Sequence, residues 1–398
     1  MRGRYPGGPV GQNADMDLLV AADDRTGAFE CAAALADHGA GPVVVTTWAA
    51  RAGLVPRDSS ANDELTADVI DLGSRHAVPA QAAARSAALP TASRNAHKID
   101  STLRGNWAEE LAVRSASGPV LLIPALPMFG RTCVDGVVLE HGRPVHEGSA
   151  GSDVRRRVDT SRPVDALRAA GLTDVDLLGD HAAVVAWLAD PAGVRVANAA
   201  DDRQIVGLVS EWGSAARARP DVVLAGTSAV IGAAAEVLGG RRPKDALPAI
   251  VHPVLVVCGS VHPAARAQLA VAERSGVAVA HLADDLAIRA LRASRVLVLA
   301  SEIPVGDVAA PMAVAAAATL ARGVTTVCEQ VDLGALIILG GDTAAAVLGD
   351  SSVEVYGSVD IGTAWARVAG FGQPVITRSG GFGSDHALID LIRSTLGR

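Results

Sequence analysis

The stretch "DLLVAADDRTGAFECAAALADHGAGPVVVTT", Asp17 to Thr47, is typical of a strand, a helix and a second strand in succession. Residues 17–22 and 41–47 are short, mainly apolar runs, and the alanine-rich segment 26–40 between them ends near a glycine, as helices often do. Apolar runs separated by helices favour parallel strands covered on both faces. This segment therefore predicts an α/β fold built on a parallel sheet.

The same alternation continues along the chain. Further strands are predicted at residues 67–72, 119–125, 193–199, 221–226, 253–259, 295–300 and 335–341, with helical segments between most of them. The stretch "LGGRRPKDALPAI", residues 238–250, interrupts the pattern with two glycines, two prolines and four charges, which is typical of an exposed linker. We therefore predict two α/β domains with mainly parallel sheets, residues 17–240 and 250–398, and an active site in the cleft between them.

Composition limits the classes of function. The 398 residues are 49% hydrophobic, carry a net charge of −8 and show no cluster of Lys and Arg, so nucleic acid is a poor candidate partner. No run approaches the roughly 18 apolar residues of a membrane span. The first 16 residues lack the apolar core of a signal peptide, and we expect them to form a disordered leader on a cytoplasmic protein. The four cysteines are far apart and form no CxxC pair, which favours buried thiols over a disulfide or a metal site.

Polar motifs follow several of the predicted strands, where ligands bind in open parallel sheets. The first motif is "ADDRTGA", which places Asp23 and Asp24 after strand 17–22 and Thr26 at the start of the next helix. One such residue would be enough to cap the helix. Two adjacent carboxylates beside Arg25 favour a functional role, in which an ionised Asp accepts hydrogen bonds from substrate hydroxyls.

The second motif, "KIDSTLRGN", begins at Lys98, which is expected at the end of a short strand from near Asn95. Residues 100–102 would form a turn, and a helix is predicted to start near Arg104. Any turn residue could serve as the helix cap, but Lys98 and Arg104 place two cations where the helix dipole favours an anion. The motif therefore predicts a site for a carboxylate or phosphate, with hydroxyl donors beside it.

A third polar loop, "PALPMFGRTCVDG", spans residues 124–136. Its two prolines, Pro124 and Pro127, restrict the loop, and turn chemistry alone explains the Asp135–Gly136 pair. The sequence leaves open whether Arg131 and Thr132 contact a ligand.

Three glycine-containing loops follow strands in the second half of the chain. "CGS" ends at Ser260, "GGDT" spans residues 340–343, and "RSGGFG" spans residues 378–383. Glycines let a ligand approach the backbone, and the N–H groups at a helix start can hold phosphate. One such loop is usually only a turn, but three in one domain predict a nucleotide pocket. The chain lacks GxxxxGK[ST], and its first strand–helix turn lacks GxGxxG, which argues against a P-loop enzyme and a nicotinamide dehydrogenase.

These motifs, together with "AGTSA" at residues 225–229, stand in the order found in the four-carbon acid sugar kinase family, which the chain resembles from residue 18 to 388. Members of this family phosphorylate sugar acids such as threonate, erythronate and 3-oxo-tetronate with ATP. The resemblance implies a sugar-acid-binding N-terminal domain, a nucleotide-binding C-terminal domain, and transfer of a phosphoryl group to the terminal hydroxyl. Mg²⁺ would neutralise charge on the phosphates.

The resemblance also implies roles for individual residues. The sugar-acid site would be lined by Asp24, Arg75, Lys98, Ile99, Asp100, Ser101 and Arg104. ATP would contact Ser260, Gly340, Gly341, Asp342, Thr343 and Gly383. The catalytic base stays open among Asp342, Asp24 and Asp100, and Asp342 could instead orient Mg²⁺, whose ligands are otherwise unassigned.

Three positions depart from the family pattern. Arg378 stands where Lys is commoner, "DIGTAW" at 360–365 replaces a Pro-Gly turn, and Arg25 replaces an apolar residue. They keep open an alternative, a paralogue with altered catalysis that binds nucleotide or sugar acid in a regulatory role. An aldolase or dehydratase is disfavoured, since no Schiff-base lysine pattern or metal cluster is evident. The expected partners are a small sugar acid and ATP, and a homo-oligomer is compatible with the sequence.

Overall fold

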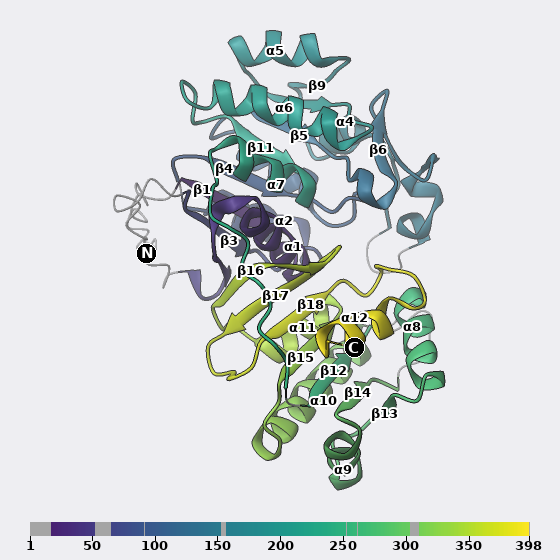
Figure 1. Cartoon of the computed structure of the whole chain (residues 1–398). Coiled ribbons are helices and arrows are strands. Elements are labelled where there is room, and N and C mark those ends of the chain that lie inside the picture. Colours follow the sequence, from purple (N-terminus) through teal and green to yellow (C-terminus); the bar gives the residue numbers. More distant parts are fainter. Residues whose placement is uncertain are drawn as a thin grey trace, which may run out of the picture.

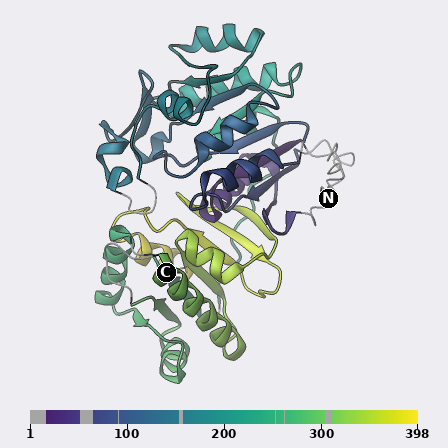
Figure 2. The same ribbon diagram turned by 180° about the vertical axis from the view of Figure 1, so that it is seen from behind.

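The computed structural model describes residues 17–51, 65–90, 92–152, 157–251, 253–260, 262–302 and 310–397. The predicted leader, residues 1–16, lies outside this part of the chain. Figure 1 shows two lobes, the N-terminal one in purple to teal and the C-terminal one in green to yellow, and Figure 2 shows the same arrangement from behind. Within the described residues, fifteen strands form one sheet that runs through both lobes, and three more strands form a small second sheet.

The N-terminal lobe is built on eight parallel strands in the order β2-β3-β1-β4-β11-β5-β10-β9. Their bounds are β1 (Leu18–Ala22), β2 (Val43–Thr47), β3 (Ala67–Asp71), β4 (Asn95–Lys98), β5 (Val120–Ile123), β9 (Val175–Leu178), β10 (Val194–Ala197) and β11 (Val223–Gly226). One face shares a core with α1 (Arg25–Leu35), α5 (His181–Ala189), α6 (Asp202–Ala215) and α7 (Ser228–Val237). The other face packs against α3 (Trp107–Arg114) and α4 (Pro163–Ala169), and α2 (Pro79–Ala87) lies against α3.

The C-terminal lobe continues the sheet in the order β13-β14-β12-β15-β18-β17-β16. The parallel strands are β12 (Val254–Cys258), β13 (Ala278–Ala280), β14 (Val296–Ala300), β15 (Ala335–Leu339) and β18 (Val375–Arg378), and β16 (Val353–Asp360) and β17 (Thr363–Val368) form an antiparallel hairpin. The helices are α8 (Pro263–Arg274), α9 (Asp285–Ser294), α10 (Ala310–Gln330), α11 (Gly341–Leu348) and α12 (Ala387–Thr395). The predicted α/β fold with mainly parallel strands is confirmed.

The two lobes are joined edge to edge through main-chain pairing. Strand β16 pairs antiparallel with β2, with Val353, Glu354 and Val355 opposite Val45, Val44 and Val43. Figure 1 shows β16 and β17 at the junction of the lobes. The proposed domain limits, 17–240 and 250–398, stay predictions, because the sheet crosses from one range to the other without a break.

Several local expectations differ from the structure. Residues 131–144, treated as a loop, form the small antiparallel sheet of β6 (Arg131–Val134), β7 (Val137–Glu140) and β8 (Arg143–Pro144). These strands are too short for their alternation to be distinguished from turns. The four cysteines are free thiols, and three are buried as predicted, whereas Cys328 is exposed on α10. No helix in the described ranges is long and apolar enough to cross a membrane.

Candidate active site

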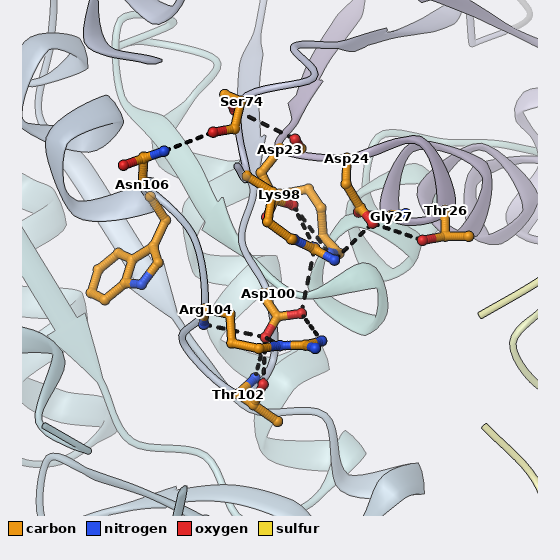
Figure 3. Close-up of polar contacts among 12 residues, drawn as sticks. Asp23, Asp24, Thr26, Gly27, Ser74, Lys98, Asp100, Thr102, Arg104 and Asn106 are labelled. Atoms are coloured by element: carbon orange, nitrogen blue, oxygen red, sulfur yellow. Dashed lines mark hydrogen bonds and ion pairs between the residues drawn. The ribbon is translucent and has the colours of Figure 1, made fainter. Parts of the chain in front are cut away.

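A polar pocket lies where β3, β1 and β4, neighbours in the sheet, reach their carboxyl ends. Figure 3 shows the side chains that follow β1 and β4 pointing toward one another. Asp24 is the N-cap of α1, and its Oδ1 accepts a hydrogen bond from the Gly27 N–H at 2.9 Å. Capping and pocket lining are therefore combined in one residue. The lining residues are Asp24, Thr26, Gly27, Glu30, Arg75, Lys98, Asp100, Ser101, Arg104, Leu126, Arg131, Thr227, Ser379 and Phe382.

Arg75 is the centre of this charged cluster. Its Nε donates to Asp23 Oδ2 at 2.7 Å and its Nη1 to Asp24 Oδ2 at 2.7 Å, and Asp100 Oδ1 lies 3.4 Å from Nη2. Burial disfavours the charge on Arg75, but these carboxylates outweigh burial and raise its pKa well above the usual value. Arg75 therefore stays cationic and holds together groups that follow three different strands.

The pKa values of the neighbouring carboxylates Asp23 and Asp24 shift in opposite directions because their surroundings differ. Asp23 is fully buried, and burial raises its pKa although Arg75 and Lys98 oppose the shift. Burial also acts on Asp24, but there Arg75 and Lys98 prevail and the pKa is lowered. Lys98 Nζ lies 3.8 Å from Asp23 Oδ1, and the carboxylates of Asp23 and Glu30 raise the pKa of Lys98 against its burial. Lys98 is thus a buried cation inside the pocket.

The Asp100 carboxylate organises the loop after β4. Its Oδ2 accepts from the Thr102 N–H at 3.0 Å and the Thr102 hydroxyl at 2.5 Å, and its Oδ1 accepts from Arg104 Nη2 at 2.8 Å. Burial opposes ionisation, but Arg104 and Arg75 hold the pKa of Asp100 well below its usual range. Both oxygens of Asp100 are therefore already engaged within the protein.

The prediction that a helix starts near Arg104 is wrong, because α3 begins at Trp107. Leu103 and Gly105 have positive φ angles of 66° and 93°, which a right-handed helix cannot contain. The Asp100 side chain also takes the backbone N–H groups of its turn, which competes with helix formation. Arg104 therefore lies in a loop beside a carboxylate, and the inference of a bound anion from unpaired cations at a helix start does not hold.

Two further residues explain the rest of "KIDSTLRGN". Gly105 is required because a Cβ there would lie 3.2 Å from Asp23 Oδ2 on a backbone with positive φ. Asn106 donates from Nδ2 to the carbonyl oxygens of Ser74 at 2.7 Å and Ala77 at 2.9 Å, and so fixes the loop that carries Arg75. The main role of the "KIDSTLRGN" motif is therefore to hold the charged side chains in position.

Of the predicted sugar-acid residues, six line the pocket together: Asp24, Arg75, Lys98, Asp100, Ser101 and Arg104. Ile99 is different, because its side chain is completely buried in the core with Leu103 and Trp107. The roles of these residues in binding and catalysis stay predictions.

The three glycine-containing loops converge at the carboxyl ends of β12, β15 and β18, which are neighbours in the sheet. The Gly259 N–H donates to Thr343 Oγ1 at 3.2 Å, and a Cβ on Gly340, whose φ is 98°, would lie 3.4 Å from Ser260 Cβ. Asp342 is exposed in the first turn of α11. These loops present backbone groups at a helix N-terminus, the arrangement that can hold a phosphate.

The glycine loops meet the polar pocket directly. A Cβ on Gly341 would lie 3.0 Å from Thr26 Oγ1 and 3.2 Å from Asp24 Oδ2. Ser379 and Phe382, from the loop after β18, line the polar pocket itself. The two candidate sites, which come from opposite halves of the chain, therefore form one composite site.

An aromatic contact between the lobes lies beside this composite site. The rings of Phe129, in the loop after β5, and Phe382 are stacked with centroids 4.2 Å apart. The Arg131 guanidinium lies 6.0 and 5.9 Å from the two ring centroids, and its Nη1 donates to Ser101 Oγ at 2.6 Å. Arg131, left open by the sequence, thus lines the pocket and links it to the contact between lobes.

Glu30 and Thr227 also line the pocket and were not singled out from the sequence. Glu30 stands three residues after Gly27 and six after Asp24, so helical spacing along α1 could have indicated a shared face. Thr227 follows β11, and its buried hydroxyl donates to the Ala125 carbonyl at 2.6 Å. It belongs to "AGTSA", a motif to which no role had been given.

Two departures from the family pattern have structural explanations. Arg25 Nη2 donates to the carbonyl oxygens of Gly349 at 3.3 Å and Ser351 at 3.2 Å, just beyond the end of α11, so it joins the lobes. Arg378 is buried and donates to Gln268 Oε1 at 2.5 Å, while Gln268 Nε2 donates to the Phe382 carbonyl at 2.8 Å. Arg25 thus joins the lobes, and Arg378 helps to hold the loop that carries Phe382 in the composite site.

Comparison with known proteins matches the N-terminal and C-terminal halves of the chain to two different domain families. Residues 18–234 match the model of a sugar-binding N-terminal domain, and residues 255–388 match that of a nucleotide-binding C-terminal domain. The D-threonate kinase of Bordetella bronchiseptica is 33% identical, over 73% of this chain and 75% of that protein. The D-threonate kinase of Salmonella typhimurium is 28% identical, over 95% of this chain and 98% of that protein.

Solved structures show the same fold. A structure from Salmonella typhimurium LT2 has a TM-score of 0.70 at 18% identity, covering 97% of this chain and all of that one. Haemophilus influenzae protein HI1011 has a TM-score of 0.65 at 18% identity, covering 95% of this chain and all of that one. With both domain models matched in order, this chain belongs to the four-carbon acid sugar kinase family.

Proposed function

We propose that this protein is an ATP-dependent kinase that phosphorylates the terminal hydroxyl of a four-carbon sugar acid of the threonate, erythronate or 3-oxo-tetronate type. One observation carries the proposal: the glycine loop at the start of α11 touches the polar pocket at Gly341, beside Thr26 and Asp24. A phosphate held by that loop would lie next to a hydroxyl held in the pocket. Phosphoryl transfer depends mainly on such positioning and on charge stabilisation.

The chemistry of the pocket suits a small polyhydroxylated acid. Lys98 and Arg131 are mostly buried cations that line it and can face a substrate carboxylate. The hydroxyls of Ser101 and Thr227 and the carboxylate of Asp24 can exchange hydrogen bonds with substrate hydroxyls. The D-threonate kinases among the relatives support a C4 acid as the acceptor.

ATP would be held on the other side by Ser260, by residues 340–343 and by the loop containing Gly383. The N–H groups of the first turn of α11, which no side chain of the described residues caps, can hold the phosphates, and the small side chains leave room for them. Mg²⁺ bound with ATP neutralises charge on the phosphates. Asp342, exposed in the first turn of α11, would orient that ion or its water ligands.

The direct test is an ADP-release assay with ATP and Mg²⁺ against both enantiomers of threonate and erythronate and their 3-oxo forms. We expect at least one substrate, with a phosphomonoester product visible by ³¹P NMR. Absence of turnover with every acid, while calorimetry shows ATP binding, would overturn the kinase proposal and favour the regulatory paralogue.

A further inference from the structure

The carboxylates that line the pocket differ in how far the protein already uses them. Asp24 accepts hydrogen bonds from Gly27, Thr26 and Arg75. Asp100 accepts from Thr102 and from Arg104. A general base needs a lone pair directed at the substrate. In Asp24 and Asp100 the oxygen lone pairs already accept hydrogen bonds from fixed donors, and the positive charge of the neighbouring arginines lowers the basicity of both carboxylates.

Glu30 is the exception. It projects from α1 one turn beyond Gly27, is half-buried and lines the same pocket. Within the described part of the chain, its carboxylate has no hydrogen-bond or ion-pair partner. A carboxylate that lines a polar pocket without a fixed donor is available to a ligand.

We propose that Glu30 is the general base that takes the proton from the substrate hydroxyl during phosphoryl transfer. This inference rests on the proposed kinase function and assigns the step that the sequence left open. The hydroxyl O–H bond breaks and its proton passes to a Glu30 oxygen as the new O–P bond forms to the γ-phosphorus. The bond from that phosphorus to the bridging oxygen breaks, and ADP leaves with the electron pair.

The electrostatic surroundings of Glu30 support this role. Loss of hydration raises its pKa to about 7, Lys98 opposes the rise, and Asp24 adds to it. A base of this pKa is ionised above neutrality yet binds a proton strongly enough to assist the transfer. Bound phosphates would add negative charge and raise the pKa further. The charged or titratable groups around Glu30 in the pocket and the adjoining cavity are Asp24, Arg75, Lys98, Asp100, Arg104, Arg131, Asp37, His38, Asp202, Lys244 and Asp360.

A route for the released proton is also present. Glu30 lines a second, larger cavity of about 570 Å³ between α1, α6, α7 and the β16–β17 hairpin. Because Glu30 borders both spaces, a proton taken up in the pocket can leave through the larger cavity. The Glu30 carboxylate would thus lose its proton and become basic again while the substrate pocket stays closed to solvent.

The test compares Glu30→Gln, Glu30→Asp and the wild type on whichever sugar acid the wild type turns over. Glu30→Gln keeps the shape of the side chain but removes the base, so kcat should fall by roughly 10²–10⁴-fold. Calorimetry should show ATP and sugar-acid affinities within about threefold of wild type. The wild-type kcat should fall below an apparent pKa near or above 7, and this acidic limb should disappear in Glu30→Gln and return, at lower kcat, in Glu30→Asp.

Glu273→Gln is the matched control, because Glu273 is an exposed helical glutamate on α8 that lines neither the pocket nor the larger cavity. Its kcat and pH profile should be unchanged. The inference is overturned if Glu30→Gln keeps kcat within threefold, keeps the acidic limb, or loses sugar-acid affinity in proportion to kcat. A wild type that turns over none of the acids would instead remove the proposed function, so the two failures are distinguishable.

Discussion

The two halves of the composite site occupy equivalent positions in their lobes but are built from opposite kinds of residue. Both lie at the carboxyl ends of neighbouring parallel strands, β3-β1-β4 in one lobe and β12-β15-β18 in the other. The first half is built from charged side chains that neutralise one another around Arg75. The second is built from glycines whose missing side chains bring loops together beside the start of α11, which no described side chain caps.

Under the proposed function, this contrast would let each half recognise a different ligand. Fixed, mutually paired charges are preorganised, so they can distinguish the hydroxyl pattern of a small acid at little cost in reorganisation. Glycine loops recognise a phosphate through backbone groups and need space rather than side chains. We therefore expect the charged half to lose its structure when one charged side chain is removed. We expect the glycine half to lose ligand binding when a larger side chain replaces a glycine.

The largest effect is expected for Arg75→Ala. The substitution leaves Asp23, which is fully buried, and Asp24 without their guanidinium partner. Removing one member of a buried ion pair typically costs about 3–5 kcal/mol, and urea unfolding at pH 7 should show a loss of that order. Arg219→Ala, which removes an exposed pair with Asp221, is the control and should leave stability nearly unchanged. Equal losses in the two variants would contradict a preorganised charged half.

The next effect is expected for Gly341→Ala, which adds one methyl group at the junction of the halves. Its Cβ would lie 3.0 Å from Thr26 Oγ1 and 3.2 Å from Asp24 Oδ2, so these pocket side chains or the glycine loop must shift slightly. We expect kcat/KM to fall at least tenfold, about 1.4 kcal/mol, with weaker binding of both sugar acid and ATP. Gly372→Ala, at a glycine with open space around it, should have no such effect. A loss confined to ATP binding would mean that the halves act separately.

Much of the fold could be predicted from the sequence, because strand and helix periods are local. The segments 17–22, 26–40 and 41–47 correspond to β1, to α1 with the turn after it, and to β2. The junction of β16 with β2 could not be predicted, since it pairs residues more than 300 positions apart whose alternation suits many partners. The continuous sheet is therefore a property of the tertiary structure alone.

The candidate site shows the same limit at the level of single residues. The motifs that contain Asp24, Lys98 and Ser260 could be located because polar residues after buried strands are unusual. The pairing of the charged side chains could not be predicted, because the turn after Asp100 depends on positive φ angles that residue types only suggest. Glu30 was overlooked because one acidic residue in a helix resembles any solvated side chain.

A smaller effect is expected for Arg104→Ala. Arg104 helps to depress the pKa of Asp100, so their interaction stabilises the folded protein above the unfolded carboxyl pKa of about 3.9 and is lost as pH falls through the folded value. Urea unfolding should show lower stability in the variant at pH 7, with the difference shrinking below about pH 4. Arg104→Lys should recover part of it. Unchanged or increased stability at pH 7 would instead support a cation strained against a helix start.

The smallest effect is expected at the stacked rings of Phe129 and Phe382, which join the two halves above Arg131. A double-mutant cycle with Phe→Leu at each position should give a coupling energy of about 0.5–1.5 kcal/mol. Because Phe382 lies in a glycine loop and also lines the polar pocket, the proposed function predicts that this coupling appears in the sugar-acid affinity and grows when ATP is bound. Calorimetry with and without a non-hydrolysable ATP analogue measures both values.

The stack of Tyr356 on Trp365, with centroids 4.7 Å apart, gives the matched control because both rings belong to the β16–β17 hairpin. The same cycle there should show coupling in unfolding free energy but none in sugar-acid affinity. If the Phe129–Phe382 cycle behaves in the same way, the stack only packs the lobes together. If instead its coupling rises with nucleotide, the glycine half transmits occupancy to the charged half through Phe382, and the two halves are one site in energy as well as in geometry.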